Sequence, residues 1–420
     1  MASQVNPPRG MRDFVPSEKA QRERVLGVIR DSYRAHGFDE IETPVMEDSS
    51  RLNAGLGGDN EKLSFGVMKR GLTTEDFQKA ETALDLVDMG LRYDLTVPLA
   101  RFYATHRGEL PSVFKAIQIA SVWRAERPQK GRYRQFVQCD IDIIGEPGGI
   151  AEAELIAATA DTLNRLGLTG WTIRVNDRRL LLGMLEILGF PKDHHDAVLI
   201  TLDKLDKVGQ EGVVAELRAR AFPEEPVKAL EDFFRRPMTM EYLPFGEAYI
   251  RKHLPAGVDD TAVKELAALA QEGVPIEFDP FLVRGMGYYT GAIFEIAHEQ
   301  LGYSLGGGGR YDGMIGRFLG TEVPAVGFSL GFERLVDLVE LPAASSEPAI
   351  ALVYDAETTA TQLTALKAAL INQGNRVRLE KRPKNIKPLL EQLDAAGYAQ
   401  YAFVNAESTG ETLELRTIGS

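Results

Sequence analysis

The 420-residue sequence contains a single cysteine, Cys139, and therefore cannot form an internal disulfide bond. None of its Cys and His spacings is typical of a zinc site. No hydrophobic run approaches the about 20 residues that span a membrane, and the N-terminal segment MASQVNPPRGMRDFVP lacks the apolar core of a signal peptide. We therefore expect a reduced, cytoplasmic protein with no membrane partner.

Several common catalytic and nucleotide-binding motifs are also missing. The sequence has no GxxxxGK[ST] phosphate loop and no GxSxG nucleophile elbow, and the glycines of GMGYYTG are not spaced as in a dinucleotide fingerprint. Positive charge is in deficit, because 48 Lys and Arg stand against 61 Asp and Glu, for a formal net charge of −13. This balance disfavours a non-specific nucleic-acid coat, although an acidic enzyme can carry a local basic face.

The composition is that of a globular protein, with 44% hydrophobic and 26% charged residues. At roughly 150 residues per domain, the length predicts two or three domains. Residues 178–275 read as a charged, mostly helical block with few strand signals. The segment LPAASSEP at 341–348 is typical of a linker, and residues 349–420 alternate strands and helices, as in a small α/β unit with parallel strands.

Three further segments predict local elements. The hydrophobic spacing of residues 17–37 predicts a long amphipathic helix. The segment LRYDLTV, which starts at Leu91, reads as a strand that leads into a helix entered at Pro98. Strands are expected again at 276–291 and 292–297.

The most informative segment is 114–145, where two apolar-rich runs flank a polar loop and predict a long antiparallel hairpin. In the second run, Gln138, Asp140 and Asp142 share one parity, while apolar residues occupy the other. One face of this strand therefore carries an amide and two carboxylates. A sheet with one solvated face would give the same pattern, so periodicity leaves both interpretations open.

The hairpin loop RAERPQKGRYR is rich in cations and holds one acid, Glu126. Guanidinium groups match phosphate oxygens in a bidentate manner, so such a loop suits a polyphosphate or an RNA backbone, with a solvated charged loop as the alternative. The polar strand face beside it favours a site that holds a zwitterion next to a phosphate. The cations of the loop are Arg124, Arg127, Lys130, Arg132 and Arg134.

Glycine is concentrated in the segment LGGGGRYDG, at residues 306–309. Four successive glycines weaken a strand, which favours close approach of the backbone to a ligand or another chain, with a flexible hairpin tip as the alternative. The preceding RGMGYYTG supplies Arg284 and two tyrosines. The following PAVGFSLGFERL places Arg334 at a strand-to-helix junction, where its glycines could equally serve packing.

A second group of cations lies within twelve residues near the C-terminus and is opposed only by Glu380. Attraction to phosphate is the simplest use for such a patch on an acidic chain, and protection of an exposed sheet edge is the alternative. The group consists of Arg376, Arg378, Lys381, Arg382, Lys384 and Lys387.

Taken in order, these segments resemble the class II aminoacyl-tRNA synthetases, and specifically the histidyl-tRNA synthetase family. The helix and strand ending at Pro44 are similar to the first, dimer-forming motif of the class, RAERPQKGRYRQF to the second, and GFSLGFERL to the third. The segments LRYDLTVPLAR, LVRGMGYYTG and GGGGRYDG are similar to stretches peculiar to the histidine enzymes. The resemblance covers nearly the whole chain.

The resemblance implies an α+β fold: a class II antiparallel sheet flanked by helices, a helical insertion and a small C-terminal α/β domain. Residues 1–177 and 276–340 would form the two parts of the catalytic core, with 178–275 as the insertion. Residues 349–420 would form a shortened anticodon-binding-like domain. The implied activity is ATP-dependent ligation of L-histidine to tRNA(His) by a homodimer, with Mg²⁺ and no metal ligands assigned among the side chains.

The resemblance also implies residue roles. The α-amino group of histidine would be held by Asp94, Thr96 and Gln138, and the imidazole by Asp142, Tyr288, Tyr289 and Tyr311. ATP would be bound by Arg124, Glu126, Arg132 and Arg334. Arg284 would face Arg124 as the second catalytic arginine and also contact histidine, and the six C-terminal cations would bind tRNA.

Two departures from the family pattern affect these expectations. Gly287 stands where the family usually has Asp, which bears on histidine binding, and the last helix of the C-terminal domain is expected to be missing, which bears on tRNA binding. The alternative function is that of a synthetase-like, histidine-sensing regulatory subunit of ATP phosphoribosyltransferase. The joint presence of the ATP-side arginines and a C-terminal domain favours the ligase.

Overall fold

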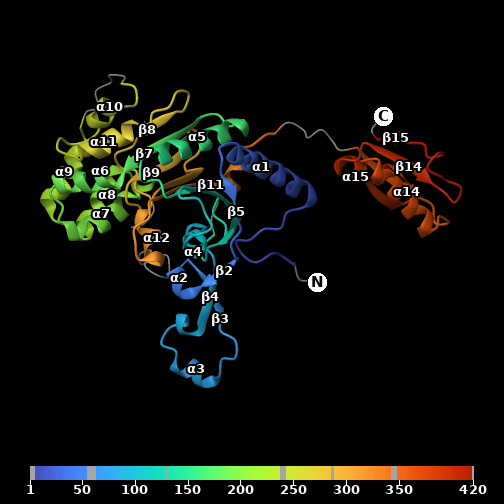
Figure 1. The fold of residues 1–420 in the computed structure, drawn as a ribbon, viewed down its shortest axis with the longest axis horizontal. Helices are drawn as coiled ribbons and strands as arrows, with labels where there is room; N and C mark the ends of the chain where they lie inside the picture. The colour runs from blue at the N-terminus through green and yellow to red at the C-terminus, as the bar shows by residue number, and fades with distance from the viewer. Residues whose placement is uncertain are drawn as a thin grey trace. The chain divides into compact units, whose positions relative to one another are not determined.

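The computed structural model describes residues 5–53, 63–128, 131–236, 243–284, 288–341 and 348–418. The chain divides into two compact units, Met1–Glu340 and Leu341–Ser420. Figure 1 draws the first unit in blue to orange and the second in red tones. Each unit has a sheet and a core of its own, so we describe the two separately.

An eight-stranded sheet organises the first unit, in the order β1-β5-β6-β11-β10-β9-β7-β8. The outermost pairs, β1 with β5 and β7 with β8, are parallel, and the pairs between them are antiparallel. The mixed sheet agrees with the expected α+β class. Its strands are β1 (Asp39–Glu40), β5 (Phe114–Trp123), β6 (Gln135–Ile144), β7 (Trp171–Asp177), β8 (Ile276–Phe278), β9 (Ala292–His298), β10 (Gly306–Arg310) and β11 (Ala325–Gly331).

The predicted hairpin is confirmed. Strands β5 and β6 pair in antiparallel register from Phe114 opposite Ile144 to Trp123 opposite Gln135. Strand β6 then pairs with β11, which places it near the middle of the sheet. Every residue from Gln138 to Ile144 is buried, so the polar face of this strand is not a solvated one.

Two long helices cover one face of the sheet, α1 (Pro16–Ala35) and α5 (Ile150–Arg165). They pack against each other, and they contact β5, β6 and β11. The helix predicted at 17–37 is thus confirmed, and its apolar stripe, Val25, Ile29 and Tyr33, is fully buried. The polar side chains of β6, Gln138, Asp140 and Asp142, lie on the opposite face of the sheet.

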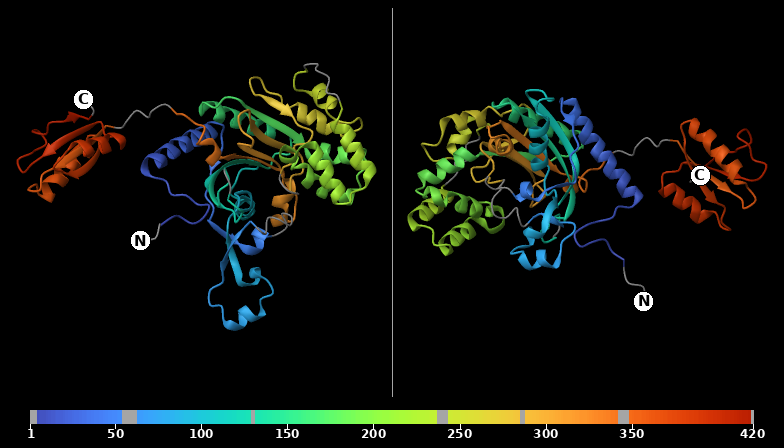
Figure 2. Two further views of the ribbon diagram at one scale, coloured as in Figure 1. Left: turned by 180° about the vertical axis from the view of Figure 1, so that it is seen from behind. Right: turned by 60° about the horizontal axis from the view of Figure 1, so that its bottom comes forward.

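A helical block interrupts the sheet between β7 and β8. The described residues of 178–275 contain helices and no strand. Figure 2 shows these helices, in green to yellow, gathered beside β7 in both views. They are α6 (Arg178–Ile187), η3 (Lys192–His194), α7 (His195–Leu202), α8 (Leu205–Ala219), α9 (Glu224–Phe234), α10 (Glu247–Lys252) and α11 (Asp260–Ala267). No helix among the described residues is long and apolar enough to cross a membrane.

A small three-stranded sheet, in the order β2-β4-β3, lies beside the large sheet. Strand β3 and the helix α3 that follows it project away from the large sheet (Figure 1). The unit is completed by short helices, of which α4 and α12 pack together. These elements are β2 (Met46–Asp48), α2 (Ser49–Asn53), β3 (Phe65–Met68), α3 (Thr74–Lys79), η2 (Ala83–Leu86), β4 (Val87–Leu91), α4 (Thr96–His106), α12 (Asp312–Leu319) and α13 (Phe332–Leu335).

Two predicted strands are wrong. In LRYDLTV only Leu91 belongs to a strand, and α4 begins at Thr96. Tyr93, Leu95 and Val97 are buried in alternation, which imitates the pattern of a strand, but they do not pair with a neighbouring strand. Its Pro98 is tolerated in the first helical turn. The strand expected at 276–291 ends at Phe278, where the Asp279 carboxylate accepts from the Phe281 N–H and forms a turn.

The second unit is a four-stranded sheet, β13-β12-β14-β15, whose first three strands are parallel, as predicted. Helix α14 packs on one face of β12 through Leu363 and Leu366, and the residues around α15 pack on the other through Leu393. The elements are β12 (Ala349–Tyr354), α14 (Ala360–Asn372), β13 (Arg376–Lys381), α15 (Lys387–Ala395), β14 (Gln400–Val404) and β15 (Arg416–Thr417).

The glycine run forms β10, an interior strand of the large sheet, and not a hairpin tip. A Cβ at Gly308 would lie 1.9 Å from the carbonyl oxygen of Gly327 on β11. The neighbouring backbones are therefore too close for any side chain here. The close approach is to a neighbouring strand of the same chain, and not to the ligand or second chain that the sequence suggested.

We expect Gly308→Ala to lower the free energy of unfolding by ~1–3 kcal/mol, because its methyl group meets backbone that cannot rotate away. The matched control is Gly313→Ala in α12, where a Cβ meets no atom within 4 Å. That change should be neutral or stabilising by up to ~1 kcal/mol. Urea unfolding of both variants measures the difference, and equal midpoints would contradict the packing described.

Candidate active site

A cavity of about 1100 Å³ lies over the polar face of the sheet. Its walls include the side chains of Gln138, Asp140 and Asp142, whereas Cys139 and Ile141 have the other parity and are buried. All twelve residues expected to bind histidine or ATP line this one cavity. They are Asp94, Thr96, Arg124, Glu126, Arg132, Gln138, Asp142, Arg284, Tyr288, Tyr289, Tyr311 and Arg334.

One end of the cavity is lined with buried carboxyl groups. Burial raises the pKa of Asp94 to about 6, and burial with the nearby Asp94 charge raises the pKa of Asp142 to about 7. Burial and the adjacent Asp142 raise the pKa of Asp140 well above its usual range. These groups resist ionisation because burial penalises charge, and a cation bound beside them would lower their pKa values and favour the carboxylate forms.

Asp142 is oriented by a tyrosine. The hydroxyl of Tyr311 donates to Asp142 Oδ1 at 2.5 Å, and the hydroxyl of Tyr288 donates to that of Tyr289 at 3.4 Å. Strand β11 leaves room for the carboxylate, because a Cβ at Gly327 would lie 1.9 Å from Asp142 Oδ1. This corner offers a carboxylate acceptor and phenol groups that can donate or accept, which suits a heteroaromatic ring with polar nitrogens.

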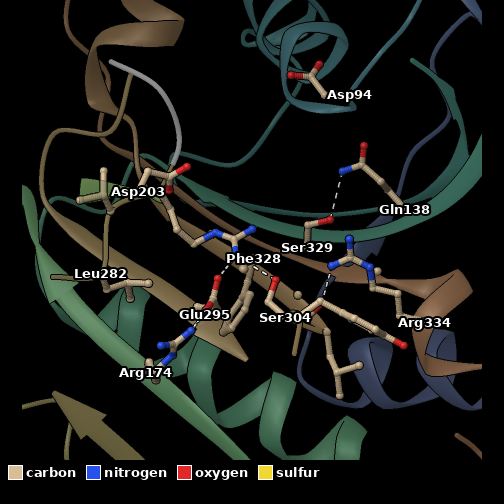
Figure 3. A pocket seen from close by; sticks show the side chains of 18 of the residues that line it. Asp94, Gln138, Arg174, Asp203, Leu282, Glu295, Ser304, Phe328, Ser329 and Arg334 are labelled. Carbon is tan, nitrogen blue, oxygen red and sulfur yellow. Dashed lines mark hydrogen bonds and ion pairs between the residues drawn. The ribbon is translucent and has the colours of Figure 1, made fainter. Parts of the chain in front are cut away.

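Gln138 lines the same cavity from β6, four residues before Asp142. Its Nε2 donates to Ser329 Oγ at 3.1 Å and approaches the two carboxyl oxygens of Asp140 at 3.3 and 3.4 Å. Ser329 Oγ in turn donates to Asp140 Oδ1. Figure 3 shows the nitrogen of Gln138 bonded to Ser329 and its oxygen turned toward the side of Asp94.

The other end of the cavity is cationic. Arg284 donates to Ser304 Oγ at 3.0 Å and forms an ion pair with Glu295, which also pairs with Arg174 from β7 (Figure 3). A Cβ at Gly307 would lie 2.8 Å from Arg284 Cζ, so the guanidinium rests directly on the glycine strand. The glycines of β10 thus leave space for side chains that belong to other segments.

Three more arginines line this end. Arg124 donates through Nε to the carbonyl of Tyr93 at 3.0 Å, and Arg132 lies 3.7 Å from a carboxylate oxygen of Glu126. Arg334 donates to the carbonyl of Ser304 at 2.5 Å. Burial and the neighbouring Arg132 and Arg284 lower the pKa of Arg334. An arginine whose pKa is lowered by neighbouring guanidinium groups favours a polyanionic ligand such as a phosphate chain.

Two features singled out in the sequence lie outside the described residues. They are Lys130 of the hairpin loop and the segment 285–287, which contains Gly287. Among the described residues there is no group of three or more His, Cys, Asp or Glu side chains that could hold a metal ion.

The six C-terminal cations lie on or next to the edge strand β13 of the second unit, and all are exposed. Three of them have partners. Arg376 lies 4.4 Å from the ring centroid of Tyr398, Arg378 pairs with Glu380, and Arg382 pairs with Asp355 at 3.3 Å. The lysines of the group, Lys381, Lys384 and Lys387, are the members best placed to meet a phosphate backbone.

Several cavity residues were not found by sequence reasoning. Ser329, Ser304 and Glu295 orient the residues that were predicted, and Arg174 supports Glu295 from β7. Ser329 is two residues before Gly331 in the predicted strand and shares the parity that faces the cavity, so period-two alternation could have identified it. The partners of Glu295 come from distant segments, and no local pattern indicates them.

The comparisons with known proteins agree with this geometry. The family model of histidyl-tRNA synthetase matches residues 10–335. A histidine–tRNA ligase of Leifsonia xyli subsp. xyli is 57% identical, covering 100% of this chain and 99% of that relative. A probable histidine–tRNA ligase of Tropheryma whipplei is 41% identical, covering 97% and 98%.

Solved structures give the same result. Histidyl-tRNA synthetase from Nostoc sp. PCC 7120 superposes with a TM-score of 0.73 at 25% identity, covering 99% of this chain and 95% of that one. An ATP phosphoribosyltransferase regulatory subunit/histidyl-tRNA synthetase from Bacillus halodurans also has a TM-score of 0.73, at 21% identity, covering 96% and 99%, and supports the fold alone. On the family match and the near full-length relatives, this chain belongs to the histidyl-tRNA synthetase family.

Proposed function

We propose that this protein is a histidine–tRNA ligase, which activates L-histidine with ATP to a histidyl-adenylate and transfers the histidyl group to tRNA(His). The observation that carries the proposal is a single cavity that combines buried carboxyl groups with five arginines, Arg124, Arg132, Arg174, Arg284 and Arg334. Such a cavity suits an amino acid with an α-ammonium group and a polar side chain, bound beside a polyphosphate.

Histidine is assigned to the carboxyl end. Asp94, Thr96 and Gln138 would hold its ammonium group, and Asp142 with Tyr288, Tyr289 and Tyr311 would hold its imidazole. An imidazole offers one donor and one acceptor, and a carboxylate with phenol hydroxyls can meet both. A near-isostere would leave these buried partners unpaired, which penalises it strongly.

ATP is assigned to the arginine end, with Arg124, Arg132 and Arg334 on the phosphates and Glu126 near the base. The attacking histidine carboxylate is already anionic, so the reaction needs no strong base. As its oxygen bonds to the α-phosphorus, pyrophosphate leaves with the bonding electron pair. Catalysis then consists of in-line positioning and of cations on the α-phosphate, supplied by Arg124 and Arg284.

Mg²⁺ fits this cavity as a companion of ATP. Mg²⁺ is usually bound by substrate phosphates with one or two carboxylates, and not in an all-protein cage. The described residues contain no such cage, and Glu126 supplies a carboxylate beside the arginines. When bound, Mg²⁺ would neutralise phosphate charge.

A homodimer and a cytoplasmic location complete the proposal. Large apolar side chains are exposed along the small sheet and its flanking segments, and a second copy could cover such side chains. They are Val45, Met46, Met68, Phe77, Leu84 and Met89.

Two measurements test the function. Histidine-dependent ATP–pyrophosphate exchange reports adenylation, and charging of purified tRNA reports transfer. A protein that binds histidine but catalyses no exchange would instead fit the alternative, a histidine-sensing regulatory subunit. The ligase is favoured because a sensor has no need of four of the cavity arginines together, namely Arg124, Arg132, Arg284 and Arg334.

Arg284→Ala should lower the rate of adenylation by ~10²–10³, the scale for loss of one preorganised electrostatic donor. The KM values for histidine and ATP should change much less, because the interaction is strongest in the transition state. Exchange kinetics measure both effects. Near-normal exchange in a folded variant would remove Arg284 from the chemistry.

Asp142→Ala should raise the histidine KM by ~10-fold or more and leave the ATP KM nearly unchanged, because it strips one partner from a buried polar ring. Exchange assays with each substrate varied in turn measure the two constants. A parallel rise in both KM values would show a general distortion of the cavity and not loss of an imidazole partner.

Charge reversal at Lys381, Lys384 and Lys387 should weaken tRNA charging several-fold. It should also reduce the slope of log affinity for tRNA against log salt concentration by up to about 3, because each lysine that meets a phosphate contributes about 1 to this slope. Exchange should be intact, because adenylation is assigned to the first unit. Lys367→Glu, on α14 of the same unit, is the control. If the triple variant charged tRNA normally, or lost exchange as much as charging, the lysines would only protect the solvated sheet edge.

A further inference from the structure

We propose that Asp140 and Ser329 are positioning residues that lock the side-chain amide of Gln138 with its oxygen toward the ligand. The proposal rests on the assignment above, in which Gln138 binds the ammonium group of histidine. It adds two residues that hold no part of the substrate in that assignment and explains how Gln138 becomes an acceptor.

Both donors of the Gln138 amide are used on the side of the sheet. One partner is Ser329 Oγ, at 3.1 Å from Nε2, and the other is the Asp140 carboxyl, at 3.3 to 3.4 Å. The Ser329 hydroxyl donates its hydrogen bond to Asp140 Oδ1, so its oxygen can only accept from Gln138. The three side chains come from β6 and β11, which pair with Ser329 opposite Asp140 and Gly331 opposite Gln138.

The amide oxygen is left without a partner. Gln138 is 8% exposed, and its Oε1 is a buried atom that accepts no hydrogen bond within the described part of the chain. An unpaired buried acceptor is costly, so its retention indicates a donor that arrives with a ligand. The oxygen lies on the side of Asp94 (Figure 3), and an ammonium group between the two would meet two acceptors.

The reversed amide would be unfavourable. Rotation by 180° would set the Gln138 oxygen against Ser329 Oγ and the carboxylate of Asp140, which in its ionised form only accepts, so acceptors would face acceptors. It would also turn two N–H groups toward the ligand and repel an ammonium group. Asp140 and Ser329 therefore determine whether Gln138 attracts or repels the α-amino group, although neither needs to touch it.

The test compares histidine with imidazolepropionate, which lacks only the α-amino group. Titration calorimetry of Asp140→Asn should show histidine binding weakened by about tenfold or more, and imidazolepropionate binding changed by less than about threefold. Ser329→Ala should give the same selective loss. It also keeps the test available if Asp140→Asn does not fold. Asp142→Ala, by contrast, should weaken both ligands, because they share the imidazole.

The decisive control uses the Gln138→Ala background. There Asp140→Asn should cause no further loss of histidine affinity, because no amide remains to be oriented. A further loss of histidine affinity in this background would mean that Asp140 contacts the ligand itself. An equal loss of affinity for histidine and imidazolepropionate in the single variants would mean that Asp140 supports the cavity in general. Either result overturns the proposal. Ile141→Val, whose side chain has the other parity, controls for repacking of the strand. Absence of histidine binding by the unaltered protein would instead refute the proposed function.

Discussion

The buried carboxylate of Glu333 joins segments that lie more than three hundred residues apart. It accepts two hydrogen bonds from Arg22 of α1 at 2.7 Å, pairs with Arg12 of the N-terminal segment, and accepts from the Val137 N–H of β6 at 3.3 Å. The two arginines compensate the buried carboxylate, and loss of Glu333 itself would leave the buried Arg22 without its carboxylate partner, so this one side chain ties these elements together. The next residue is Arg334, and its place on the cavity wall follows from this anchor.

The cavity combines two arrangements that are unfavourable without a ligand. Carboxyl groups are gathered at one end although burial opposes their ionisation, and guanidinium groups are gathered at the other although they repel one another. The glycines of β10 and β11 make this possible, since they leave the sheet bare where Arg284 and Asp142 rest on it. A ligand with an ammonium group and phosphates would relieve both ends, so stability has been exchanged for preorganisation.

Local periodicity predicted the parts of the fold whose pattern comes from one buried face: α1, the β5–β6 hairpin and the parallel strands of the second unit. It failed at LRYDLTV, where tertiary burial imitates strand alternation, and at the glycine run, where the reason for glycine is the neighbouring backbone. In the site, the resemblance to the synthetase family indicated which residues gather, and composition alone indicated only the arginine-rich hairpin loop and the polar face of β6. Alternation along β11 could have identified Ser329, whereas Glu295 could not be assigned, because no local pattern indicates its partners Arg174 and Arg284.

The helical block between β7 and β8 has a consequence for how this architecture diversifies. Adjacent parallel strands require a crossover of about a dozen residues, and this chain uses 178–275 for it. Among the described helices of the block, α6 and α11, at its two ends, make the most extensive backbone contacts with β7. Between them, the segment that joins α7 to α8 lines the cavity through Leu202, Asp203 and Leu205, and Asp206 pairs with Arg174 of β7. A change in the length of the block therefore has to keep this segment in place, so the crossover that closes the sheet also builds part of the cavity wall.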